Sequence, residues 1–369
     1  MVESNPTVPL RSIQDHVQKM LQVGVSIHKV HREKATTTKQ VTGDYTKQYE
    51  VLRDYLMELQ PTNVGTSVKL EVVNEPNSAI ETWQFKRVYI SLGELKKGFK
   101  AGLRDILGLD DDFIKDPFPG QVLTTVVLAS NNGIYPLAYA IVETENMSSW
   151  KCKFDKDAFE WLKKTPFNIG PEVIFRQSRI KYIAQLFVQF FNNKLSHGRN
   201  KPIISCLEYI RQYLMKRFCN VKKVVSKAPG PLTPTTSKLL ERNREALVQN
   251  RARWNGTAKY EFYGPWYDHH VVDMTNTSCT CRRWELKGIP CRHAIATIHE
   301  MADIRDNVGE LYTYVNKVYW LQTWNEAYSY TVDPIKRRTM LPKSTYPFQL
   351  TQPPHHIQSG DQRSREREV

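Results

Sequence analysis

The sequence predicts a mixed fold, α+β or α/β, in which a sheet packs with helices and a smaller domain follows. Residues 67–73 alternate apolar and polar side chains, as a half-buried strand does. Residues 121–130 contain a continuous apolar run, which is typical of a strand buried on both faces. A helix from Pro202 to about Phe218 is predicted by apolar residues on one face: Ile203, Leu207, Ile210 and Leu214. The length of 369 residues corresponds to roughly two domains.

The other elements of the first half follow from local patterns. Apolar residues at helical spacing predict a helix over 45–60, and residues 91–106 also resemble a helix. Strands are predicted at 108–115, 121–130 and 134–144. Asn131-Asn132-Gly133 separates the last two, and Asn and Gly tolerate the positive φ of a tight turn. We therefore expect an antiparallel meander of three strands.

Composition divides the chain into segments. Residues 221–235 hold three prolines and a glycine, which predicts a linker. The expected segments are an N-terminal helical or flexible region (1–60), a sheet region (61–145), a shortened helical region (146–220), the linker (221–235), a cysteine- and histidine-containing domain (236–305), C-terminal helices (306–345) and a disordered tail (346–369). Within the fifth segment, we expect a polar helix over about 236–251 and a strand at 270–273.

The charge of the chain favours a polyanionic partner. Lys and Arg total 52 against 38 Asp and Glu, giving a net charge of +14. Nucleic acid is the first expectation, an anionic membrane surface is the second, and a merely soluble basic protein is the alternative. We expect no membrane span, because no apolar run reaches about 18 residues, and the N-terminus lacks the pattern of a signal peptide. Six cysteines are too few for a disulfide scaffold, which favours a reducing compartment.

The strongest chemical signal is a cluster of three cysteines and one histidine. Cys279-Thr-Cys281 is followed, after nine residues, by Cys291-Arg-His293. Three thiolates and one imidazole complete a tetrahedral shell for one Zn²⁺, with no open position, so the site would be structural. Unligated thiols are the alternative, whereas an iron–sulfur cluster normally needs four cysteines. Pro290 can open a helix that begins at this second pair. His269, His270 and His299 lack ligand spacing and are interpreted as surface residues.

Basic residues crowd this cluster. They are Arg282, Arg283, Lys287 and Arg292. A zinc ion with three thiolates and one histidine carries about −1 net charge, so these cations could neutralise it. They could instead contact the phosphates of a nucleic acid. The sequence leaves both roles open.

The segment VVDMTNTSCTCRRWELKGIPCRHAIATI, residues 271–298, resembles a SWIM zinc finger. In particular it is similar to the finger near the C-terminus of plant Mutator-like (MULE, MuDR-type) transposases. The resemblance extends over roughly 20–345, with a gap near 146–189. It implies a partial RNase H-like region over 61–145, a DNA partner and a nuclear location.

The same resemblance implies a lost catalytic site. Residues 85–146 are similar to the start of the transposase core, which uses three carboxylates to hold two divalent metal ions. The first family aspartate corresponds to Asp110, and the position of the family glutamate holds Gln189. The motif that carries the second aspartate is missing. Because one carboxylate cannot hold two metal ions, we expect no transposase activity.

The sequence therefore predicts a zinc-binding, transposase-derived protein that is not an enzyme and is associated with DNA through its zinc finger. Two alternatives stay open. The zinc finger could instead be a protein-interaction module. The chain could also be an active transposase whose sequence record lacks part of the catalytic core. A small-molecule substrate and a membrane partner are not expected.

Overall fold

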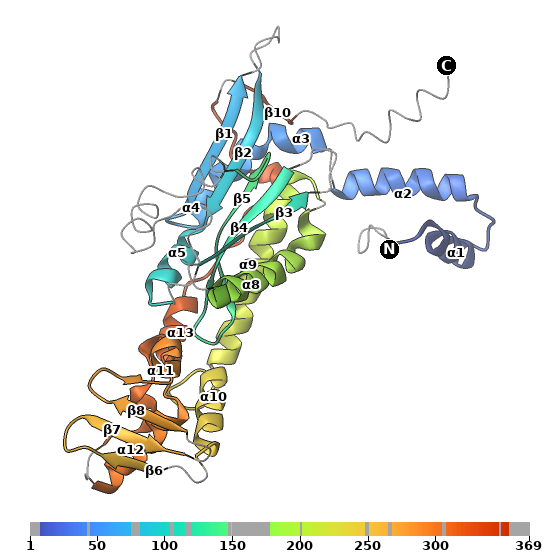
Figure 1. Ribbon diagram of the computed structural model, residues 1–369. Coiled ribbons are helices and arrows are strands. Elements are labelled where there is room, and N and C mark those ends of the chain that lie inside the picture. The colour runs from blue at the N-terminus through green and yellow to red at the C-terminus, as the bar shows by residue number, and fades with distance from the viewer. Residues whose placement is uncertain are drawn as a thin grey trace, which may run out of the picture.

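The computed structural model describes residues 8–42, 45–74, 82–103, 107–114, 120–146, 149, 178–199, 201–247, 251–264, 268–304, 308–346 and 348–353. Figure 1 shows a sheet with packed helices at one end of the molecule and a smaller sheet at the other. The prediction of a mixed helix and sheet fold is confirmed, with both sheets largely antiparallel. In the described part of the chain, no helix combines the length and apolar character needed to cross a membrane.

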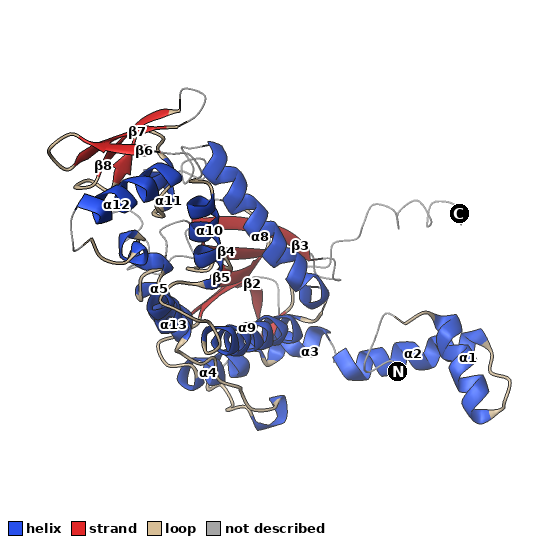
Figure 2. Cartoon of the chain, turned by 90° about the horizontal axis from the view of Figure 1, so that it is seen from below, coloured by secondary structure: helices blue, strands red, loops and turns tan. Residues whose placement is uncertain are grey.

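In the described residues before the first sheet, the chain forms four helices. Helices α1 (Leu10–Leu21) and α2 (Ile27–Thr42) pack on each other and extend away from the body (Figure 2). The Lys34 ammonium in α2 donates to the Val8 carbonyl just before α1 at 2.6 Å, which links the two helices. The helix predicted over 45–60 is found as two helices, α3 (Tyr45–Glu50) and α4 (Leu52–Thr62).

The larger sheet has the order β1-β2-β5-β4-β3. Its strands are β1 (Ser67–Asn74), β2 (Trp83–Ser91), β3 (Leu107–Ile114), β4 (Gly120–Leu128) and β5 (Ile134–Val142). The predicted meander is confirmed, because β3 pairs with β4 and β4 with β5, both antiparallel. The hairpin turn is also found: Asn132 has a φ of 56°, and the Ala129 N–H donates to the Gly133 carbonyl at 2.7 Å.

Helices from distant parts of the chain share one core with this sheet. They are α5 (Gly93–Lys100), α8 (Ser178–Arg199), α9 (Ile203–Val225) and α13 (Leu321–Tyr328). The predicted face of α9 is confirmed, since Leu207, Ile210 and Leu214 are fully buried. The Tyr135 hydroxyl donates to the Leu95 carbonyl at 2.9 Å and links β5 to α5.

The chain reaches the smaller domain through α9 and α10 (Pro234–Glu245). α9 continues to Val225, inside the predicted linker, because its last turn still buries that side chain. The polar helix expected over 236–251 ends earlier than predicted, and residue 251 begins a strand. The smaller sheet has the order β6-β7-β8-β9 and contains β6 (Arg251–Trp254), β7 (Lys259–Tyr263), β8 (His269–Asp273) and β9 (Ser278–Cys279). Helices α11 (Arg283–Lys287) and α12 (Arg292–Ile304) complete it.

The C-terminal region differs from the expected run of helices over 306–345. Apart from α13, its described helices are short 3-10 segments: η1 (Leu311–Tyr314), η2 (Lys317–Tyr319) and η3 (Arg338–Met340). The tail expected to be disordered over 346–369 also contains structure. Its strand β10 (Leu350–Thr351) pairs with β2 in parallel, because the apolar Leu350 side chain is buried in the main core. Residues 354–369 lie outside the described part.

Candidate metal centre

The four predicted ligands come together at one end of the smaller sheet. Cys279 ends β9 and Cys281 lies in the following turn, while Cys291 directly precedes α12 and His293 lies in its first turn. Their sulfur and nitrogen atoms all lie within 4.8 Å of one another. Nδ1 of His293 is 3.4 Å from Sγ of Cys279 and 3.8 Å from Sγ of Cys291. The predicted ligand cluster is therefore present in the structure.

Two backbone positions shape the loop between the cysteine pairs. Arg282 has a φ of 60°, and its N–H donates to the Cys279 carbonyl at 2.8 Å, which closes the turn around Cys281. Gly288 has a φ of 66° and ends α11, with its N–H donating to the Trp284 carbonyl at 2.7 Å. A Cβ atom at Gly288 would lie 2.9 Å from Cβ of Asn316, so only glycine fits there without displacement.

The ligands sit in a small apolar cluster. Cys279, Cys291 and His293 are buried, and Cys281 is half-buried. The buried side chains packed with the cysteines are Val272, Trp284 and Ala294. Four protein ligands of this type leave no open coordination position, which suits a structural zinc ion rather than a catalytic one.

Neighbouring ligands shift the pKa values of Cys279, Cys281 and His293. Bonds with Cys279 and Cys291 lower the pKa of the Cys281 thiol, and a bond with Cys281 raises the pKa of Cys279. Burial acts to lower the pKa of His293, but hydrogen bonds to Cys281 and Cys291 outweigh it and raise this pKa to about 9. The ligand atoms are thus close enough to shift one another's pKa values. A divalent metal replaces the protons of these groups and lets all three thiols ionise together.

The four predicted basic residues have two different surroundings. Arg282, Arg283 and Lys287 are exposed on or beside α11. Arg292 is half-buried, and its guanidinium pairs with the carboxylate of Asp268. The sequence analysis missed Asp268, because this residue lies outside the motif that the four ligands form.

The histidines near the site also differ from one another. His269 and His299 are exposed, as predicted. His270 is half-buried instead, because its ring stacks on that of His293, with 4.2 Å between the ring centroids and 28° between the planes. Its Nε2 lies 3.1 Å from Oδ1 of Asp268.

Asp110, the predicted remnant of a catalytic site, lies on β3 against α8. Its Oδ2 accepts a hydrogen bond of 3.1 Å from Nδ2 of Asn192, and the Thr124 hydroxyl donates to the side-chain Oδ1 of Asn192 at 3.0 Å. Gln189, one turn earlier on α8, is exposed. Within the described ranges, the His, Cys, Asp and Glu groups spaced to share a metal ion lie in the smaller domain and do not include Asp110.

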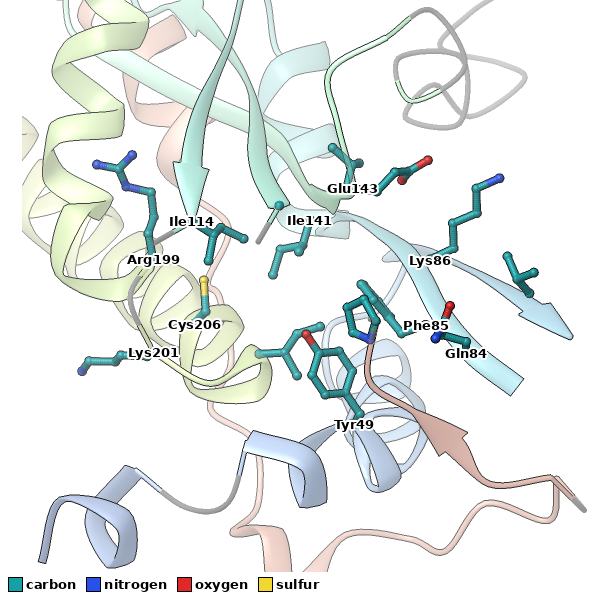
Figure 3. Close-up of a pocket in the computed structure, with 15 residues that line it drawn as sticks. Tyr49, Gln84, Phe85, Lys86, Ile114, Ile141, Glu143, Arg199, Lys201 and Cys206 are labelled. Carbon is teal, nitrogen blue, oxygen red and sulfur yellow. The ribbon is translucent and has the colours of Figure 1, made fainter. Parts of the chain in front are cut away.

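A separate cavity of about 160 Å³ lies in the larger domain, between α9 and the ends of β2 and β5 (Figure 3). Its wall is mostly apolar, with the basic side chains of Lys86, Arg199 and Lys201 around it. The Arg199 guanidinium pairs with Asp112, so this cation has an internal partner. The cavity shares no residue with the cysteine cluster.

A family model for the SWIM zinc finger matches residues 270–301 of this chain. Neither a curated protein nor a solved structure matches this chain. The matched range contains all four ligands found together in the structure. The chain therefore contains a SWIM zinc finger at residues 270–301, in which Cys279, Cys281, Cys291 and His293 are suited to one Zn²⁺ ion.

Proposed function

We propose that this chain is a zinc-dependent, DNA-associated nuclear protein, derived from a Mutator-like transposase and no longer able to cleave DNA. The observation that carries the proposal is the position of Arg282, Arg283 and Lys287. These exposed cations lie on one short segment whose conformation is tied to the zinc ligands on either side. Basic side chains held on a folded segment are the usual contacts of DNA phosphates.

The zinc finger orders this basic segment through a single buried side chain. Trp284 is 2% exposed and packs with the cysteines, so its neighbours along α11 face outwards. The net charge of +14 adds a long-range attraction to nucleic acid. Arg292 is left out of the proposed DNA contacts, because its guanidinium already forms an ion pair with the Asp268 carboxylate.

DNA affinity measured against salt concentration tests this proposal. Removing both Arg283 and Lys287 by alanine substitution should weaken binding and reduce the log–log salt slope by about 2, since each phosphate contact contributes about 0.9. The matched control removes two exposed lysines of the larger domain, Lys223→Ala with Lys227→Ala. Equal slopes for the two double variants would contradict a DNA contact at the zinc finger.

One observation favours a second candidate function, a protein-interaction module. Leu286 is 67% exposed on α11, between the basic residues and away from the Trp284 side. A leucine side chain can pack against an apolar partner surface, whereas it offers a phosphate backbone no hydrogen bond or charge. Absence of salt-dependent DNA binding by the unchanged protein, together with a protein partner lost on Leu286→Ser, would favour this function.

The environment of Asp110 supports the loss of catalysis. Two-metal phosphoryl chemistry needs several carboxylate oxygens around the ions. Asp110 instead faces the neutral amide of Asn192, and the Gln189 side chain is exposed. Neither amide supplies the negative charge of the missing acids.

We expect no strand cleavage when the full chain is incubated with DNA and Mg²⁺ or Mn²⁺, under conditions in which a two-metal nuclease is active. Cleavage by the unchanged protein that disappears in Asp110→Asn would refute the inactive assignment. Sequencing the transcript across codons 145–190 separates the remaining alternative, because a restored segment with the second aspartate would indicate an active transposase with an incomplete record.

A further inference from the structure

The two ring nitrogens of His293 face different surroundings. Nδ1 points to the sulfur atoms of Cys279 and Cys291, at 3.4 and 3.8 Å. Nε2 faces the opposite way and lies 3.4 Å from Oδ2 of Asp268. Nδ1 is therefore the nitrogen placed to bind the metal, and Nε2 is the one placed against a carboxylate.

We propose that Asp268 is a positioning residue of the zinc centre, whose carboxylate accepts the Nε2 hydrogen of His293 and thereby fixes the ring with Nδ1 towards the metal. A neutral imidazole carries one hydrogen, so metal binding through Nδ1 requires that hydrogen on Nε2. The His293 side chain is only 3% exposed, and bulk water is therefore a poor acceptor for it. A carboxylate in this place also makes the ring a more basic ligand.

Arg292, next to His293, shows why a carboxylate is needed at this place. Without a metal ion, Nε of Arg292 donates a hydrogen bond of 3.2 Å to Nε2 of His293. Both nitrogens carry hydrogen when Nδ1 binds zinc, so neither can accept from the other. Oδ2 of Asp268 accepts from the Arg292 guanidinium and lies 3.4 Å from Nε2 of His293, so it is the acceptor within reach of both side chains.

Asp268 is itself held by a second histidine. Its Oδ1 lies 3.1 Å from Nε2 of His270, whose Nδ1 lies 2.9 Å from the hydroxyl of Thr280. Thr280 stands between the first two cysteine ligands, and its hydroxyl oxygen also accepts from the Val271 N–H at 3.1 Å. The chain of contacts thus runs from the ligand loop through His270 and Asp268 back to the ligand His293. Asp268 precedes the matched range 270–301, and this inference depends on the zinc centre but not on DNA binding.

Zinc affinity of the full-length protein gives the first test. Competition with a chelator should show Asp268→Ala binding zinc 10–100-fold more weakly, the loss typical of removing such a partner. The matched control is Glu261→Gln, because Glu261 also contacts a histidine, with 2.7 Å to Nε2 of His269, but on the outer face of the same sheet. Its zinc affinity should equal that of the unchanged protein. An Asp268→Ala affinity within about threefold of it would overturn the proposal.

A spectroscopic measurement separates positioning from a general effect on folding. In zinc-saturated protein labelled with ¹⁵N-histidine, the Nε2–H resonance of His293 should exchange slowly with water and lie downfield. In Asp268→Asn, which keeps the size of the side chain but removes its charge, this resonance should move upfield. In Glu261→Gln it should stay in place. An unchanged His293 resonance in Asp268→Asn would overturn the proposal even if zinc bound more weakly, and the milder variant provides this readout where Asp268→Ala fails to fold.

Discussion

Cys291→Ser is expected to abolish tight zinc binding and to unfold the zinc finger. A serine hydroxyl is a poor replacement for a thiolate at a structural zinc site. The apparent binding energy of such a site is about 10–16 kcal/mol, far more than a small domain has in reserve without its metal. Cys291 is also buried against Trp284 in one of the apolar clusters of this domain. Zinc content by elemental analysis and proteolysis across residues 251–304 measure the two effects.

The loss should be confined to the zinc finger. The main core lies between the larger sheet and its helices, and it includes none of the zinc ligands. The larger domain should therefore keep its own melting transition. Cys219→Ser is the control, because Cys219 is an exposed cysteine on α9 outside the cluster. Full zinc content in Cys291→Ser, or equal zinc loss in Cys219→Ser, would contradict the ligand assignment.

Gly98→Ala is expected to destabilise the larger domain by about 3 kcal/mol. A Cβ atom at this position in α5 would overlap the Ala327 carbonyl of α13 and the Tyr135 hydroxyl of β5. Because the Ala327 carbonyl belongs to the backbone of α13, it can move aside only if α13 separates from α5. Within a helix, Gly→Ala normally stabilises by up to about 1 kcal/mol, so the expected sign is the reverse of the intrinsic preference. Chemical denaturation followed by circular dichroism measures the change.

Gly24→Ala is the matched control for this effect. No heavy atom lies within 4 Å of a Cβ built at Gly24, in the loop between α1 and α2. Its stability should stay within about 0.5 kcal/mol of the unchanged protein. A Gly98→Ala variant as stable as the control would mean that α13 does not pack closely on α5 at this position.

Patterns of short range predicted much of the fold and the metal site. Alternation over 67–73 and the apolar run over 121–130 gave the correct strands, because burial on one or both faces leaves a direct mark on the sequence. The zinc ligands were predictable because tetrahedral coordination restricts residue type and spacing together.

Contacts between distant segments could not be predicted, because no local sequence pattern indicates them. Nothing near Leu350 indicates that β10 pairs with β2, which lies more than 250 residues earlier in the chain. Asn192, rather than Gln189, faces Asp110 because the rotation of α8 on the sheet decides which residue points inward. Asp268 directly precedes β8 and lies near His293 because α12 packs on that strand, and single-sequence patterns do not encode this packing.

X-ray absorption at the zinc edge tests the central claim most directly. Zinc-loaded protein should contain one zinc ion per chain, with three sulfur neighbours at about 2.3 Å and one nitrogen at about 2.0–2.1 Å. That shell matches Cys279, Cys281, Cys291 and His293, the cluster at the end of the smaller sheet. A shell dominated by oxygen or nitrogen, or zinc far below one ion per chain, would contradict the account.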